Sequence, residues 1–253
     1  MEHHSILYGP VNRLLLALLG PPPLAKFSPG WREFLFPDGG NIWLPDTAIM
    51  ALFLTLLFAI FFPIAARSFD RERPGSIQNF LEMIVGAIRD LLEDVIGHGA
   101  GRKYLAIIGA FSLFIFFGNL FGLIFPLQPP TGSLSTTVAL AVIAFLYFNW
   151  QGFKEHGFFG YLKHFMGPVW WLAPLFFVIE MIGNFARILS LSLRLFMNIS
   201  GEHTVTGFFA SLLPIFVPWP LMALGLFTAL LQAFIFVTLT AVYINLSTAH
   251  EEH

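Results

Sequence analysis

Two arginines, Arg187 and Arg194, lie inside an apolar stretch of the chain, 169–199. An arginine in hydrocarbon costs at least about 2.5–3.5 kcal/mol, so its presence there needs a reason. Two carboxylates and two amides accompany the arginines, and we call the six side chains the polar stripe: Glu180, Asn184, Arg187, Arg194, Asn198 and Glu202. On an α-helix all six fall within an arc of about 80°. The stripe predicts a charge-lined ion path; the alternative is a polar network that only joins helices.

A second apolar stretch, 219–246, carries Thr228 and Gln232 four residues apart, on a face that could meet the stripe. A lone intramembrane glutamine is more often an interhelical hydrogen-bonding group. His203 directly follows Glu202, and such a pair near a membrane surface can relay protons near neutral pH. A solvated loop pair fits the local sequence equally well.

Other site chemistries find little support. The chain has no cysteine, no Gly-Lys dipeptide of a P-loop and no G-x-S-x-G motif. The histidines and glutamates at 3–4 and 250–253 are expected to be solvated chain ends rather than metal ligands. We therefore expect no metal and no cofactor. The net charge of −2 argues against nucleic acid as a partner.

The composition indicates the solvent in which these residues act. Of 253 residues, 57% are hydrophobic, 31 are phenylalanine and only 11% are charged, whereas soluble domains are about 25% charged. The predicted fold class is therefore an all-α polytopic membrane protein, with the lipid bilayer as its surroundings.

The order of apolar and polar segments predicts five membrane helices. We expect them over about 46–66, 104–127, 134–150, 169–199 and 219–246, the last two being the longest. Residues 1–45 form a predicted extramembrane or interfacial arm, and 46–253 the membrane domain. Residues 76–96 alternate apolar and charged positions at helical spacing, which predicts an amphipathic helix at a membrane surface or against other helices. No internal repeat supports an inverted-repeat transporter.

The distribution of lysine and arginine predicts the orientation. Six lie within 67–103 and two within the polar loop expected over 151–167, while 128–133 and 200–220 hold none. The positive-inside rule then places the N-terminus outside and the C-terminus in the cytoplasm.

Three motifs resemble those of subunit a of F-type ATP synthases. They are the run from Ser190 to Glu202 (SLSLRLFMNISGE), the run from Leu231 to Phe236 (LQAFIF), and Gly118 to Ile124 (GNLFGLI) followed by Pro130-Thr131. The ending Glu251-Glu252-His253 is similar too. The resemblance covers roughly residues 75–253.

This resemblance implies a non-catalytic, proton-conducting stator subunit of a bacterial inner (plasma) membrane. Its partners would be a rotating c-subunit ring, b-type peripheral-stalk subunits and the remaining synthase subunits. Arg194 matches the family's essential arginine, which faces the ring carboxylate and separates two half-channels. Asn198 and Gln232 match positions that flank it, and Glu180 and Arg187 match earlier polar positions. The outer acidic or histidine position falls on Glu202 or His203.

The resemblance also implies that the last two helices tilt strongly along the ring. Two departures are visible: Ser133 and Ser135 stand where the family often has Asp and Asn, and Gly225 stands where some members have a polar residue. The rival readings are a stand-alone ion channel or secondary transporter, and a purely structural membrane subunit. The choice between H⁺ and Na⁺ stays open, because the ring's own site would decide it.

Overall fold

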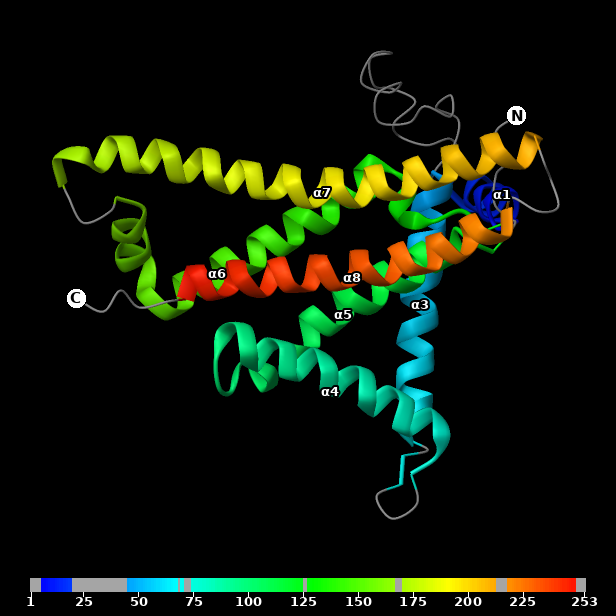
Figure 1. Cartoon of the computed structure of the whole chain (residues 1–253), viewed down its shortest axis with the longest axis horizontal. Coiled ribbons are helices and arrows are strands. Elements are labelled where there is room, and N and C mark those ends of the chain that lie inside the picture. Colours follow the sequence, from blue (N-terminus) through cyan, green and yellow to red (C-terminus); the bar gives the residue numbers. More distant parts are fainter. Residues whose placement is uncertain are drawn as a thin grey trace. The chain divides into compact units, whose positions relative to one another are not determined.

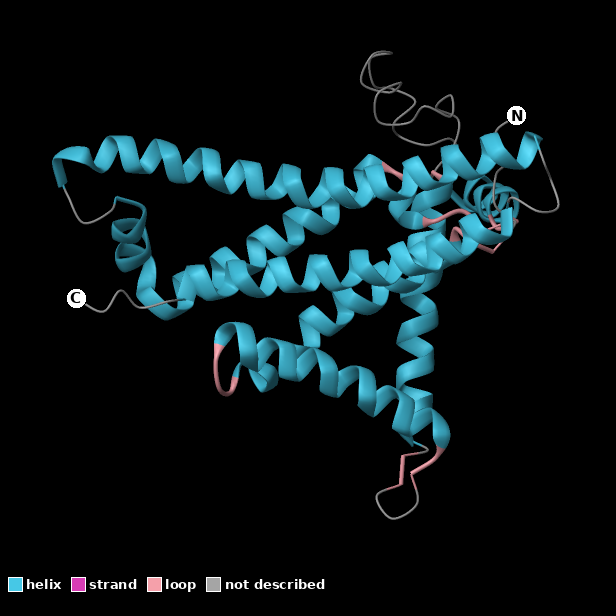
Figure 2. Ribbon diagram, in the orientation of Figure 1, coloured by secondary structure: helices cyan, strands magenta, loops and turns pink. Residues whose placement is uncertain are grey.

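The structure is a computed structural model that describes residues 6–19, 45–67, 69–70, 74–124, 127–166, 170–212 and 218–248. Regular structure in these ranges is helical, with seven α-helices, two short 3-10 turns and no strand (Figure 2). The predicted all-α polytopic class is confirmed. Of the predicted N-terminal arm, 6–19 and Pro45 are described, and the motif at 251–253 lies outside the described residues.

Figure 1 labels the seven α-helices in chain order. They are α1 (Tyr8–Leu19), α3 (Asp46–Arg67), α4 (Ser76–Ile96), α5 (Ala100–Phe121), α6 (Leu134–Met166), α7 (Ala173–Leu212) and α8 (Pro218–Thr248). The described residues contain five stretches long and apolar enough to cross a membrane: α3, α5, α6 as far as Gly157, α7 as far as Phe209, and α8 from Trp219.

Two helices continue into segments that the sequence predicted as loops. The first helix of α6 does not end near 150 but runs to Gly157, whose non-helical φ of 71° suits glycine and separates it from a second helix that ends at Met166. α7 does not end near 199 but passes through Gly201 to Leu212. Polar residues had indicated a loop over 151–167, and Gly201 with the prolines beyond it had indicated a connecting segment after 199. The segment 151–156 contains no proline, however, and one interior glycine costs a helix only about 1 kcal/mol.

α5 ends earlier than the predicted 127. Its last turn is tightened by three successive i→i+3 hydrogen bonds, in which the amides of Gly122, Leu123 and Ile124 donate to the carbonyl oxygens of residues 119, 120 and 121. Such tight turns commonly close helices. The chain then passes through the 3-10 turn η2 (Pro130–Gly132) into α6.

The chain divides into two compact units, and α5, α6, α7 and α8 contribute to both. The first unit takes its residues from 1–67, 114–136 and 196–230, and the second from 68–113, 137–195 and 231–253. In the first unit, Met50, Leu54 and Phe121 form a buried cluster, beside which the rings of Phe58 and Phe117 pack edge to face at 5.4 Å.

In the second unit, α4 packs its apolar face against other helices. The buried cluster joins α4 to α5, α6 and α8 and comprises Ile88, Leu92, Ala100, Tyr104, Ile108, Phe148, Val237, Ala241 and Ile244. The opposite side of α4 exposes Asp90 and Asp94. The predicted amphipathic helix is confirmed, and it lies against other helices of its unit.

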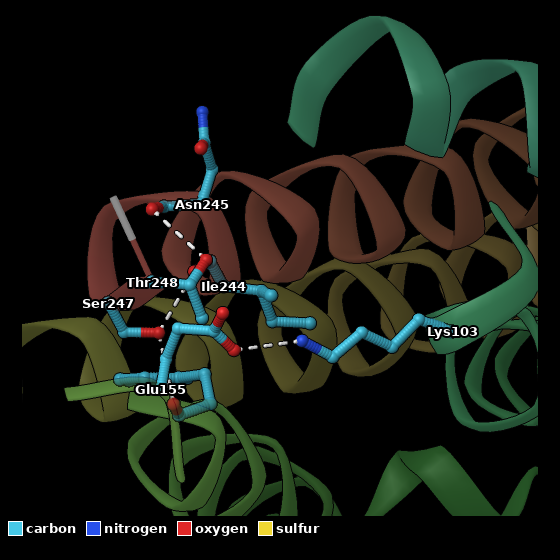
Figure 3. Close-up of polar contacts among 7 residues, drawn as sticks. Lys103, Glu155, Ile244, Asn245, Ser247 and Thr248 are labelled. Carbon is cyan, nitrogen blue, oxygen red and sulfur yellow. Dashed lines mark hydrogen bonds and ion pairs between the residues drawn. The ribbon is translucent and has the colours of Figure 1, made fainter. Parts of the chain in front are cut away.

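Polar contacts fix the ends of helices within the second unit. Figure 3 shows Lys103 and Glu155 joined by an ion pair, with Nζ and Oε2 3.1 Å apart. Asn245 Nδ2 donates to the carbonyl oxygen of Val95 at 2.9 Å, and Ser247 Oγ donates to that of Phe148 at 3.0 Å. These bonds tie the end of α8 to α4 and α6.

Gly152 allows Tyr161 and the backbone of Ser247 to pack closely against α6. A methyl group there would meet the ring of Tyr161 and the carbonyl oxygen of Ser247, the latter at 2.9 Å. We predict that Gly152→Ala lowers the stability of the purified protein by about 1–3 kcal/mol, as overpacking does in other cores. Gly109→Ala is the matched control, because nothing lies within 4 Å of its added methyl group. Thermal unfolding in detergent measures both, and equal midpoints would contradict the packing described.

Candidate functional site

The polar stripe lies on α7, a single helix of 40 residues. Glu180, Asn184, Arg187 and Arg194 belong to the second unit, whereas Asn198 and Glu202 belong to the first. The side chains are not equally accessible: Asn184 is buried, Asn198 is exposed, and the other four are half-buried. The two arginines of the stripe differ most in what surrounds them.

Arg187 is fully engaged. Its Nη2 lies 3.4 Å from Oε1 of Glu180, and its Nη1 donates to Oδ1 of Asn184 at 3.0 Å. Its guanidinium carbon lies 5.3 Å from the ring centroid of Tyr243, on α8. The charge is therefore neutralised by a carboxylate and covered by an aromatic face.

Arg194 has much weaker partners. Its Nη2 donates to Oγ of Ser190 at 3.4 Å, and none of the ion pairs formed by the described residues includes it. Leu191 and Leu195 beside it are buried, and Met197 is an exposed apolar neighbour. A cation without a carboxylate in apolar surroundings attracts any anion that can reach it.

Gln232 is 2% exposed on α8, within the same unit as Arg194. The glutamine therefore belongs to the packed interior of its unit, unlike Asn198, which is exposed. The sequence had grouped both with Arg194 by resemblance alone.

Glu202 meets α8 through a neutral hydrogen bond. Thr228 Oγ1 donates to Oε2 of Glu202 at 3.1 Å and also contacts the carbonyl oxygen of Gly225 at 3.0 Å. Gly225 makes room for this carboxylate, since a methyl group there would collide with Oε1 of Glu202. The expectation that Thr228 meets the stripe is confirmed.

A pocket of about 760 Å³ opens beside Glu202, entirely within the first unit. Glu202, His203, Thr204 and Thr206 of α7 line it, and Thr47 and Gln128 do so from other segments. His203 stands over Gly122, where an added methyl group would lie 2.6 Å from Nε2. The volume suits water, of which each molecule takes about 30 Å³ in the liquid, and polar side chains are present in the lining to bond it.

Asn119 and Thr131 form a buried pair near this pocket, whose lining includes Gly132, the residue after Thr131. Thr131 Oγ1 donates to Oδ1 of Asn119 at 2.6 Å, and the two side chains are 0% and 3% exposed respectively. The bond ties η2 to the end of α5, while Gly118 lets Pro130 approach α5 closely. The sequence had noted these residues as a motif, without their pairing.

Tyr243 and Tyr161 were missed from the sequence, because a tyrosine in an apolar run carries no signal of its partner. Tyr161 is 4% exposed and donates to Oδ1 of Asn149 at 2.9 Å. Burial raises the pKa of Tyr161 to about 12, with Arg187 lowering it and Glu180 raising it. The phenol therefore stays protonated and neutral at physiological pH.

Metal chemistry finds no support in the described part of the chain, where no group of three or more His, Cys, Asp or Glu side chains could hold an ion. The terminal histidines at 3–4, 250 and 253 lie outside the described residues.

The sequence is similar to those of known proteins over most of its length. The sequence model of the family described as ATP synthase A chain matches residues 48–245. A protein named ATP synthase subunit a from Geobacter sulfurreducens is 43% identical over 205 residues, covering 80% of this chain and 89% of its own length. One of the same name from Helicobacter hepaticus is 42% identical over 225 residues, covering 87% and 99%. A third, from Sulfurihydrogenibium, is 40% identical over 205 residues, covering 81% and 98%.

The pocket can be tested for water without disturbing its charges, because the chain has no native cysteine. We predict that Thr206→Cys, inside the pocket, reacts with a charged methanethiosulfonate reagent at least about tenfold faster than Phe185→Cys, since apolar surroundings suppress the reactive thiolate. Phe185 is 62% exposed on α7 but does not line the pocket. Labelling rates in membranes, with reagent on both sides, provide the measurement. Equal rates would mean that the pocket is dry.

Proposed function

We infer the function from one premise, which is that this chain belongs to the ATP synthase A chain family. It is a multi-pass membrane protein and a component of that synthase's membrane sector. We propose that it is the ion-translocating stator subunit, which provides two half-channels against a rotating ring of c subunits. It makes and breaks no covalent bond, so it is not itself an enzyme.

The contrast between the two arginines carries this proposal. Arg187 is paired with Glu180, whereas Arg194 has the Ser190 hydroxyl at 3.4 Å and forms no ion pair with a described carboxylate. A fixed cation in a low dielectric stabilises the ionised form of a carboxylate that comes near it. Arg194 would thus attract each deprotonated ring carboxylate as it passes. The same charge would repel a proton moving directly between the half-channels.

The remaining stripe residues would line the two routes to Arg194. The pocket at Glu202 and His203 fits one half-channel, because it is roomy and because this titratable pair lines it together with Thr204 and Thr206. Glu180, Asn184 and Arg187 would line the other. Asn198 and Gln232 would flank the exchange point, with Gln232 as part of the packed wall.

The partners and location follow from the same proposal. The ring, b-type stalk subunits and remaining synthase subunits would assemble around this chain in a bacterial inner membrane. The N-terminus would lie outside and the C-terminus in the cytoplasm, and α7 and α8 would tilt along the ring. Each proton crossing a potential of 100 mV would deliver about 2.3 kcal/mol to rotation.

We predict that Arg194→Ala abolishes ATP-driven acidification of inverted membrane vesicles, at equal amounts of assembled synthase. The loss should be at least about a hundredfold, which corresponds to about 2.7 kcal/mol of lost attraction for the ring carboxylate. Acidification is followed with a pH-sensitive fluorescent dye.

Arg102→Ala is the control, because this arginine is exposed at the start of α5 and lies outside the stripe. It should pump at a near-normal rate. If Arg194→Ala also pumped normally in assembled synthase, Arg194 would be a structural residue and the stator mechanism proposed for this chain would be wrong.

A further inference from the structure

We propose that Glu180, Asn184 and Tyr243 neutralise and immobilise Arg187, so that Arg194 is left as the stripe arginine offered to the rotor. We call the four residues the Arg187 clamp. The proposal rests on the stator function above and adds a specific role for the clamp within it. Glu180, Asn184 and Tyr243 are positioning residues in this account, since within the clamp they act through Arg187.

Two arginines on one face of a helix pose a problem for a rotary motor. Arg187 and Arg194 are seven residues apart, which is about 10.5 Å along an α-helix and a rotation of only about 20°. In a low dielectric, both cations would attract the same passing carboxylate. A second free cation would hold that carboxylate away from Arg194 and slow its exchange.

Glu180 removes this competition by supplying the opposite charge. It lies seven residues before Arg187, again on the same face, with Oε1 3.4 Å from Nη2. Asn184 lies between them and accepts from Nη1 at 3.0 Å. The carboxylate and the amide thus engage both terminal nitrogens of the guanidinium.

Tyr243 fixes the guanidinium from a second helix. The guanidinium carbon stands 5.3 Å from the ring centroid of Tyr243, and that ring lies 5.7 Å from the ring of Phe148 on α6. The aromatic face favours a cation beside it. Because Phe148 is 1% exposed and belongs to the buried cluster of its unit, the platform beneath Arg187 is held rigidly.

The neighbouring Tyr161 keeps the clamp neutral overall. The charges of Glu180 and Arg187 both act on its phenol, and burial raises its pKa to about 12. At physiological pH Tyr161 therefore adds no negative charge, and one arginine is balanced by one glutamate.

The test is a two-residue cycle in the whole synthase. Glu180→Gln keeps the shape of the side chain but frees the charge of Arg187, so ATP-driven acidification per assembled synthase should fall about tenfold, equivalent to about 1.4 kcal/mol. Adding Arg187→Gln removes the freed cation, and the double variant should pump at least about fivefold faster than Glu180→Gln alone. A purely structural loss would not be reversed by removing a second member of the clamp, once rates are normalised to assembled complex.

Asp90→Asn is the matched control. It also removes the carboxylate from an arginine pair, since Asp90 Oδ1 lies 3.1 Å from Nη2 of Arg89, but that pair is exposed on α4. Its pumping should match the wild type. A loss as large as that of Glu180→Gln would show that the effect is not specific to the clamp and would overturn the inference.

Two further outcomes would overturn it. One is normal pumping by Glu180→Gln, which would mean that Arg187 needs no neutralisation. The other is a double variant as slow as Glu180→Gln, which would make Glu180 important in its own right, for example as an ion relay. Arg194→Ala, assayed in parallel, tests the stator function separately, so either inference can fail while the other stands.

Discussion

A guanidinium in hydrocarbon is the constraint on which the rest of this structure depends. Each intramembrane arginine costs at least about 2.5–3.5 kcal/mol unless polar groups surround it, and α7 carries two of them. For Arg187 the protein supplies a carboxylate and an amide from α7 itself and the aromatic ring of Tyr243 from α8. The ring of Tyr243 in turn packs against Phe148 on α6. For Arg194 it supplies a hydroxyl at 3.4 Å. In the function we propose, the missing carboxylate comes from the rotor.

Small residues make this polar chemistry possible between helices. Gly225 leaves the space that the Glu202 carboxylate occupies, and Gly122 does the same for His203. Gly118 admits Pro130 to the side of α5, so that Thr131 can reach Asn119. In membranes, where helices gain no hydrophobic energy by leaving lipid, close backbone approach and interhelical hydrogen bonds replace it. Both features, glycines with close neighbours and interhelical hydrogen bonds, occur around the pocket of the first unit.

Sequence reasoning predicted what depends on local pattern. The lengths of the apolar segments predicted the five candidate spans. The helical period placed the stripe residues, up to 22 positions apart on α7, on one face. The same reasoning ended α6 and α7 too early, because polar residues at 151–156 and Gly201 indicate loops although a helix accepts both. Sequence reasoning could not predict most of the contacts that these side chains make with other helices. Nothing in the run around Tyr243 predicts an arginine beside its ring, because that contact depends on how α7 packs against α8.

The two glutamates of the stripe illustrate why contacts, rather than residue types, decide function. Glu180 is fixed opposite a guanidinium, with its Oε1 3.4 Å from Nη2 of Arg187. Glu202 takes part in none of the ion pairs of the described residues; it accepts a hydrogen bond from the neutral Thr228 and faces a pocket large enough for water. A hydroxyl can accept as well as donate, so Thr228 can bond Glu202 in either protonation state. In the function we propose, Glu202 would therefore be the glutamate that exchanges a proton, and Glu180 the one that holds the charge of Arg187 in place.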